Sequence, residues 1–126
     1  MQSYDITVGE GRLRVNLQAT FTGNGINILL TGGESPHIGA VVVCMPSSTD
    51  KESPVLKSEV ITVPTHREAD VARPMAEVVC GVTRQVTVVA AGIHIDQAQG
   101  WEIVALSENC NLAGRKLCEQ LEQIDM

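Results

Sequence analysis

Aromatic side chains are scarce in this sequence, in which Tyr4, Phe21 and Trp101 make up 2% of 126 residues. The chain therefore has little material for stacking a planar ring between aromatic side chains. Basic residues are few as well: nine Lys and Arg, scattered along the chain, stand against fifteen Asp and Glu, and the net charge is −6. Nucleic-acid binding needs clustered basic residues, so it is not expected.

Long apolar runs and paired cysteines are also missing. No apolar run approaches the roughly 18 to 20 residues that span a bilayer, and the first residues lack the basic and then apolar pattern of a secretory signal. We therefore expect a cytoplasmic protein that does not bind a membrane. Cys44, Cys80, Cys110 and Cys118 form no CxxC pair, so buried, free and inert thiols are expected.

What the sequence does contain is typical of one globular domain over residues 1–126, with 44% hydrophobic and 19% charged residues. Alternating or continuous apolar patterns predict strands, and apolar residues three and four apart predict helices. A polar loop is expected at 46–54. The predicted strands are 4–8, 12–19, 26–31, 40–45, 55–63 and 85–91, and the predicted helices are 65–81 and 96 to near the end of the chain.

The helix boundaries are predicted from local signals. Thr65 and Glu68 have the spacing of a capping box, with Thr65 as the N-cap, and Gly81 is expected to end the first helix. Pro74 predicts a kink or a restart within that helix. Asp96 is the expected N-cap of the second helical region, which a break at 109–111 would divide in two.

The order of the predicted elements determines the directions of the strands. Strands 26–31 and 40–45 are joined by a short connection, so we expect them to be antiparallel neighbours. Strand 55–63 then runs the same way as strand 26–31. A helix separates it from strand 85–91, which is the βαβ arrangement of parallel strands. The predicted fold class is α/β (α+β), with a mixed, mainly antiparallel sheet, one βαβ unit, and helices packed on the sheet.

Each of the three strands that run in the same direction is followed by a histidine. The segments are SPHIG with His37, PTHRE with His66, and GIHID with His94. Ligands of α/β sheets gather beyond the carboxyl ends of such strands, where loops and helix N-termini converge. We therefore predict that the three histidines share one edge of the sheet and mark a site.

Two kinds of ligand suit that edge. An anion could bind to backbone N–H groups of Gly32 and Gly33 and to the helix N-terminus at 65–67, where Arg67 adds a guanidinium. A transition metal could bind to His37, His66, His94 and Asp96, which supply imidazole and carboxylate ligands. Nucleophilic catalysis is not indicated, because the sequence has no GxSxG elbow.

The run TGGESPHIGAV, followed by PTHRE and GIHID, resembles a bacterial family of prenylated-flavin chaperone-like proteins, typified by the D component of gallate decarboxylase systems. The resemblance implies a fold akin to that of proteasome assembly chaperones. It also implies a non-catalytic accessory protein that helps a prenylated-flavin-dependent decarboxylase to acquire or keep its modified FMN. The site residues that it implies are Gly33, Pro36, His37, Gly39, His66, Arg67, Glu68, Gly92, His94 and Asp96.

The leading hypothesis is thus an accessory protein that binds prenylated FMN or FMN. Arg67 and the helix N-terminus at Thr65 would hold the phosphate, a loop at Gly32 and Gly33 would close over it, and the three histidines would donate hydrogen bonds. A metal-dependent enzyme or enzyme subunit, with a site of three histidines and one aspartate, is the alternative. An assembly module with a purely structural histidine cluster is a third. Self-association is expected through a sheet edge or the helical stripe.

Overall fold

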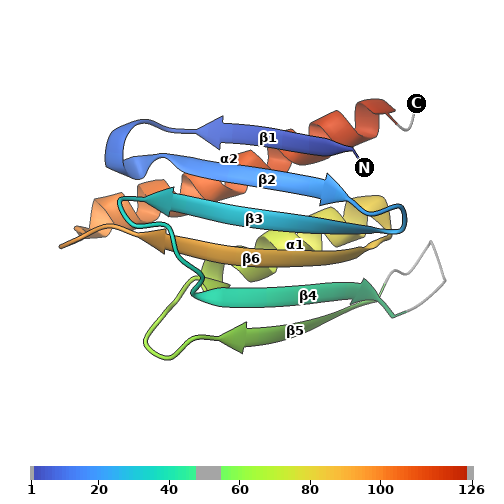
Figure 1. Cartoon of the computed structure of the whole chain (residues 1–126), viewed down its shortest axis with the longest axis horizontal. Helices are drawn as coiled ribbons and strands as arrows, with labels where there is room; N and C mark the ends of the chain where they lie inside the picture. The colour runs from blue at the N-terminus through green and yellow to red at the C-terminus, as the bar shows by residue number, and fades with distance from the viewer. Residues whose placement is uncertain (1, 48–54, 125–126) are drawn as a thin grey trace.

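A computed structural model describes residues 2–47 and 55–124 of the chain (Figure 1). The described strands form one six-stranded sheet in the order β1-β2-β3-β6-β4-β5. Both helices lie behind the sheet in the view of Figure 1, so they cover the same face. The elements are β1 (Ser3–Val8), a 3-10 turn η1 (Gly11–Leu13), β2 (Val15–Phe21), β3 (Gly25–Gly33), β4 (Ala40–Pro46), β5 (Leu56–Thr62), α1 (Ala69–Thr83), β6 (Val86–His94) and α2 (Gly100–Ile124).

The predicted fold class is confirmed. The pairs β1–β2, β2–β3, β4–β6 and β4–β5 are antiparallel, and β3–β6 is parallel. The predicted directions of β3, β5 and β6 are correct as well. Most of the predicted loop at 46–54 lies outside the described residues. The predicted strand at 12–19 starts later than expected, because residues 11–13 turn in η1 before β2 begins.

The prediction that β3 and β4 are neighbours is wrong, because β6 lies between them and pairs with both. None of the β6 residues 87–92 is exposed, which suits the centre of a sheet. β5 and β6 are parallel, but β4 separates them. The 34–39 connection from β3 to β4 must therefore cross the end of β6, and this crossing builds the edge where the histidines lie.

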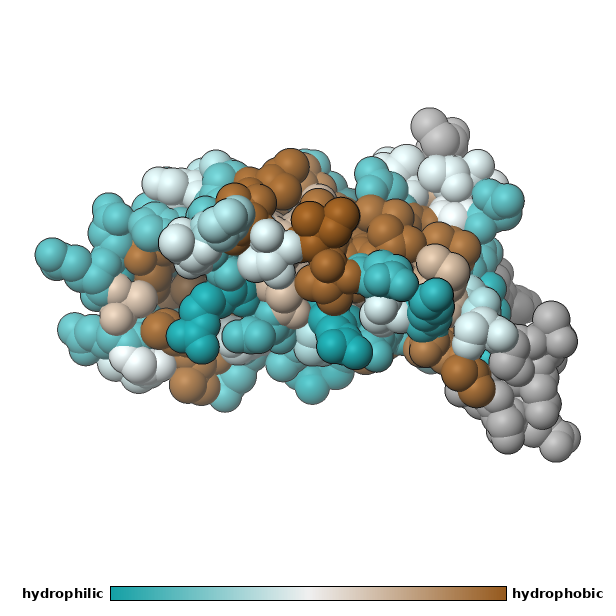
Figure 2. All heavy atoms as spheres, turned by 90° about the horizontal axis from the view of Figure 1, so that it is seen from below, coloured by the Kyte–Doolittle hydropathy of each residue, from teal (hydrophilic) through white to brown (hydrophobic). Residues whose placement is uncertain are grey.

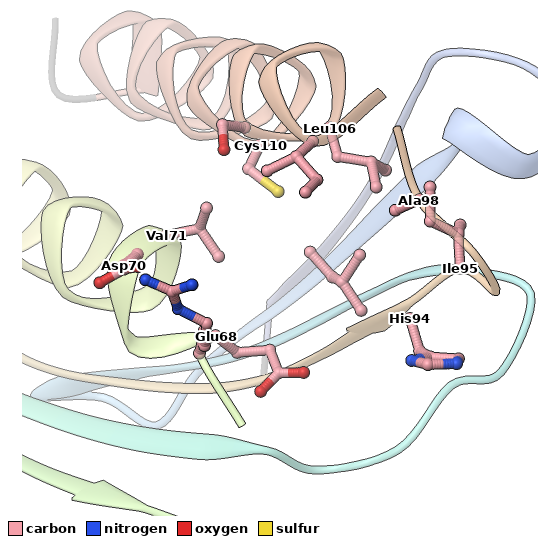
Figure 3. Close-up of a pocket in the computed structure, with 12 residues that line it drawn as sticks. Glu68, Asp70, Val71, His94, Ile95, Ala98, Leu106 and Cys110 are labelled. Atoms are coloured by element: carbon pink, nitrogen blue, oxygen red, sulfur yellow. The ribbon is translucent and has the colours of Figure 1, made fainter. Parts of the chain in front are cut away.

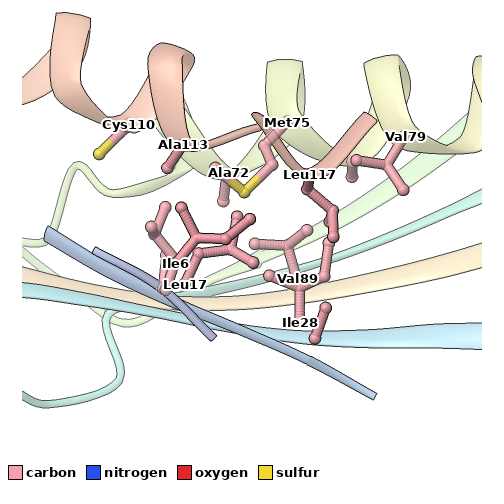
Figure 4. Close-up of a cluster of buried hydrophobic side chains, with 14 of the residues drawn as sticks. Ile6, Leu17, Ile28, Ala72, Met75, Val79, Val89, Cys110, Ala113 and Leu117 are labelled. Carbon is pink, nitrogen blue, oxygen red and sulfur yellow. The ribbon is translucent and has the colours of Figure 1, made fainter. Parts of the chain in front are cut away.

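The core lies between the sheet and the helices (Figure 4). Alternate strand residues point to this side, and Leu17, Ile28 and Val89 are fully buried there beneath Val79 of α1 and Leu117 of α2. α1 packs on β4, β5 and β6, whereas α2 packs on β1 and β2 and against α1. The prediction of four buried, free cysteines is confirmed.

The first helix differs from its prediction at both ends. α1 begins at Ala69 with Glu68 as its N-cap residue and has no side-chain cap, whereas Thr65 lies in a preceding turn at φ +72°. The capping box is therefore wrong, because the carboxylate of Glu68 turns to the histidines instead. The helix runs through Pro74, an exposed residue in its second turn, and through Gly81. It ends where Arg84 adopts the left-handed conformation and its N–H bonds to the Cys80 carbonyl.

The second helix also differs from its prediction. α2 begins at Gly100 and is continuous over 25 residues, so Asp96 is not its N-cap and 109–111 does not break it. The carboxylate of Glu102 accepts the N–H of Gln99 at 3.0 Å, which is the capping interaction of this helix. The Asn109 amide does not compete with the helix backbone, because it donates outward to the Leu13 carbonyl. Within residues 2–47 and 55–124, no helix is long and apolar enough to cross a membrane.

Apolar side chains gather on the surface at the β5 side of the molecule (Figure 2). β5 is an edge strand of the sheet. Exposed large apolar side chains at β5 and on α1 are Val60, Ile61, Val63, Val78 and Val82, of which Ile61 is 73% exposed.

Candidate functional site

The three histidines do lie at one edge of the sheet. His37 is in the crossing segment after β3, His66 is in the turn after β5, and His94 is the last residue of β6. The ring centroids of His37 and His66 are 4.8 Å apart, and those of His37 and His94 are 6.3 Å apart. The geometric part of the prediction, one shared edge, is confirmed.

Glu68 joins two of these histidines. Its Oε1 lies 2.9 Å from Nε2 of His37 and 3.4 Å from Nδ1 of His66, and the two ring nitrogens are 3.2 Å apart. Only 9% of Glu68 is exposed. The sequence pattern assigns this carboxylate to helix capping, so its place between the histidines is a finding of the structure.

The environment of this triad shifts two pKa values in opposite directions. The pKa of His37 is raised, mainly because its Nδ1–H donates to the Ser35 carbonyl and also because Glu68 is near, and burial works against this. Burial by itself raises the pKa of Glu68, but hydrogen bonds from its own backbone N–H, His37 and His66 together lower it. The carboxylate is therefore ionised at neutral pH.

Three of the predicted glycines make room for this arrangement. A Cβ on Gly39 would overlap the Glu68 carboxylate, and a Cβ on Gly92 would overlap the backbone carbonyl of His37. Gly33 has φ +76°, and a Cβ there would overlap the carbonyl of His94. Gly33 and Gly92 are required because the crossing segment packs directly on the end of β6, whereas Gly39 leaves room for the Glu68 side chain.

The predicted phosphate-closing loop at Gly32 and Gly33 is wrong. Both residues belong to β3, and the N–H of Gly33 donates to the Arg14 carbonyl at 3.0 Å, so it is not free for an anion. A Cβ on Gly32 would lie 2.8 Å from the same carbonyl oxygen. Close packing of β3 against the start of β2 accounts for these two glycines. Pro36 is exposed in the crossing segment, and Thr65 is exposed in the turn before α1.

His94 and Asp96 form a separate pair, with Nε2 and Oδ1 at 2.9 Å. The structure therefore does not assemble the predicted metal set of His37, His66, His94 and Asp96, and it brings Glu68 to the first two histidines instead. The reason is local: His94 ends β6 and Asp96 follows two residues later, so their side chains are close enough to pair with each other.

Arg12 holds the segment after His94 through a group of hydrogen bonds, here called the clamp, which the sequence did not predict. The Arg12 guanidinium bonds to Glu102 at 2.8 and 3.2 Å, to Glu34 at 3.2 Å and to the Asp96 carbonyl at 2.8 Å. Glu34 also accepts the N–H of Asp96. A backbone hydrogen bond from Gln99, together with Arg12, lowers the pKa of Glu102 against the opposing effect of burial. No local pattern could have shown this clamp, since its members are up to 90 residues apart.

A pocket of about 460 Å³ opens beside the histidine edge, on the helix side of the sheet (Figure 3). It lies between the start of α1, the end of β6 and the first turns of α2. This volume is within the usual range for small-molecule sites. Its apolar lining includes Val71, Ile93, Ile95, Ile103 and Leu106. Its polar lining includes Arg67, Glu68, Asp70, His94 and Ser107.

Comparison with known proteins assigns the family. A family model described as a prenylated flavin chaperone LpdD-like domain matches residues 9–122, a span that includes every predicted site residue. The chain belongs to this family. The resemblance seen in the sequence motifs is thereby confirmed, and the family's description as a chaperone agrees with the prediction of a non-enzyme.

The fold has a solved counterpart in a yeast protein. A chain of the structure titled "Crystal Structure of a Novel Chaperone Complex for Yeast 20S Proteasome Assembly" matches with a TM-score of 0.63 over 98% of both chains. Sequence identity is 16%, so this likeness concerns the fold alone. No curated protein sequence matches the chain. The predicted proteasome-assembly-chaperone-like fold is thus confirmed for this family member.

Proposed function

We propose that this protein binds a prenylated flavin in the pocket beside the histidine edge and supplies it to a decarboxylase that depends on that cofactor. The observation that carries the proposal is an open, largely aliphatic pocket of about 460 Å³ in a chain of the prenylated flavin chaperone family. A carrier needs a site that holds its ligand without reacting with it. Aliphatic walls with a few polar groups at one side meet that need.

In this proposal, different parts of the pocket would take the two ends of a flavin nucleotide. Ile93, Ile95 and Leu106 would contact the ring system and its prenyl addition, and burying their apolar surface supplies the driving force. Arg67 is the arginine among the lining side chains, and it lies two residues before the start of α1. The phosphate would therefore bind to its guanidinium at the positive end of the helix.

Titration of the purified protein with FMN and with prenylated FMN tests the phosphate assignment. We expect one prenylated FMN per chain, and Arg67→Ala to weaken binding at least tenfold, since a hydrogen bond to a charged group contributes about 1.5–3 kcal/mol. Arg73→Ala is the matched control, because Arg73 is an exposed arginine of the same helix that pairs with Glu77. Failure of the folded wild type to bind, or equal losses in both variants, would contradict the proposal.

A second pair of variants tests the pocket itself. Ser107 lines it from α2, whereas the next residue, Glu108, is exposed and does not line it. Ser107→Trp fills the cavity and should abolish binding, and Glu108→Trp should leave the affinity unchanged. Binding that survives Ser107→Trp in a folded protein would place the flavin elsewhere.

Delivery is tested with an apo-decarboxylase of the prenylated-flavin type. We expect the loaded protein to restore decarboxylase activity faster than the same concentration of free prenylated FMN in the presence of excess FMN as a competitor. The Ser107→Trp variant should give no such advantage. If the free cofactor restores activity equally fast, the delivery role is wrong even where the cofactor binds.

A further inference from the structure

We infer that His37, His66 and Glu68 form a binding site for a divalent transition metal such as Zn²⁺. The three ligand atoms are His37 Nε2, His66 Nδ1 and Glu68 Oε1, which lie within 4.8 Å of one another. The inference does not depend on flavin binding, and it replaces the metal set that the sequence suggested.

Three atoms that can each give a lone pair to a metal ion lie side by side in the triad. His37 Nδ1 lies 2.9 Å from the Ser35 carbonyl oxygen, which can only accept, so Nδ1 carries a hydrogen and Nε2 is the ring atom that can bind a metal. This Nε2 lies 2.9 Å from a carboxylate oxygen of Glu68 and 3.2 Å from Nδ1 of His66. A single metal ion can accept a lone pair from all three atoms.

The spacing of the three atoms fits a tetrahedral ion. Zn–N and Zn–O distances of about 2.0–2.1 Å place neighbouring ligand atoms about 3.3–3.4 Å apart. The observed separations are 2.9, 3.2 and 3.4 Å. Two histidines with one glutamate and an open fourth position form a known zinc ligand set. The Ser35 carbonyl provides the outer-shell hydrogen bond that fixes the orientation of a ligating histidine.

Glu68 supplies a second, independent observation. Its carboxylate is more than nine-tenths buried, and its Oε2 has no hydrogen-bond partner among the described residues. Within that part of the chain, its ion pairs are with His37 and His66, both of which are neutral unless protonated. A buried carboxylate is costly without positive charge beside it, and a metal ion provides that charge.

A metal ion can reach the triad from solvent on the side of the two histidines. The side chains of His37 and His66 are 24% and 32% exposed, so an ion can enter from solvent and keep a water molecule or another ligand in its fourth position. Glu68 also lines the pocket described above, so the ion would lie at its margin.

The test is isothermal titration of untagged, chelator-treated protein with ZnCl2, accompanied by thermal melts with and without the metal. We expect one Zn²⁺ per chain and a rise in Tm. His37→Ala, His66→Ala and Glu68→Gln should each weaken binding about tenfold or more. The matched control is His94→Ala, which removes a histidine from the same edge but leaves the triad intact, and it should bind as the wild type does.

Cobalt gives a readout that does not depend on affinity alone. Co²⁺ at the triad should show the intense visible absorption of a tetrahedral ion, and Zn²⁺ should displace it. Absence of stoichiometric binding to the folded wild type would overturn the inference in favour of a protonated His37 paired with Glu68. Loss of binding in His94→Ala equal to that in His37→Ala would overturn the ligand set. Because neither titration contains flavin, failure here is distinct from failure of the proposed function.

Discussion

Gly92→Ala tests whether the crossing segment packs directly on β6, which is the feature that brings the site together. A Cβ at residue 92 would overlap the carbonyl of His37 and lie 3.0 Å from its amide nitrogen. These obstacles are backbone atoms that no change of rotamer can move, so the segment must shift away from the strand. The adjoining hydrogen bonds from Gly39 N–H to the Ala91 carbonyl and from Val63 N–H to the Gly39 carbonyl, both 2.8 Å, would be strained with it.

The loss of stability in Gly92→Ala follows from the steric overlap and from the two strained hydrogen bonds. Overpacking costs about 1–3 kcal/mol. The two hydrogen bonds are strained rather than lost, so each costs about 0.5 kcal/mol, the low end of the usual range, and we expect a total loss of about 2–4 kcal/mol. At about 2.1 cal/mol/K per residue, the unfolding entropy of 126 residues is about 0.26 kcal/mol/K. Tm should therefore fall by about 8–15 °C in calorimetry, and zinc binding should weaken because His37 moves.

The control is Gly81→Ala. A Cβ at this helical glycine would lie 3.8 Å from Cδ1 of Leu56, an ordinary contact. Alanine is favoured over glycine within a helix by about 1 kcal/mol, so Tm should stay the same or rise by about 4 °C. A Gly92→Ala protein with the same Tm as the wild type would refute the packing of the crossing segment on β6.

Three further predictions concern the core, the thiols and the surface. Leu117→Ala leaves a cavity at a fully buried position and should lower the free energy of unfolding by about 2–5 kcal/mol in urea titration. A loss below about 1 kcal/mol would contradict the packing of α2 on the sheet. Burial raises the pKa of Cys110 to about 12, so at pH 8 its thiol should react with a disulfide reagent far more slowly in the native protein than in urea, and equal rates would show that it is accessible. Self-association stays a prediction, and sedimentation at micromolar concentration should show an oligomer. Ile61→Asp should dissociate this oligomer, because Ile61 is 73% exposed on an edge strand. A monomeric wild type would refute the prediction.

Strand directions could be predicted from sequence because they depend on local patterns and on the order of the elements. The short connection between β3 and β4 and the helix between β5 and β6 were sufficient to place His37, His66 and His94 at one edge. The insertion of β6 between β3 and β4 could not be predicted in this way, since it depends on which of several apolar strands takes the central position. That choice is made by packing across the whole sheet.

The role of Glu68 shows why local signals can mislead. The spacing from Thr65 to Glu68 is that of a capping box, but Thr65 has φ +72° and the carboxylate faces the histidines. The glycines were found by resemblance, and the structure explains Gly39 and Gly92 by steric room rather than by ligand contact. The pocket was missed because Ile93, Ile103 and Leu106 come from segments whose apolar residues indicate only a core.

The central claim is that this protein holds a prenylated flavin, and native mass spectrometry tests it most directly. The wild type and the Ser107→Trp variant would each be incubated with prenylated FMN, freed of unbound cofactor and weighed under non-denaturing conditions. We predict that the wild type gains the mass of one prenylated FMN per chain and that Ser107→Trp gains none. A folded wild type that gains no flavin mass, or a variant that gains as much, would contradict this claim.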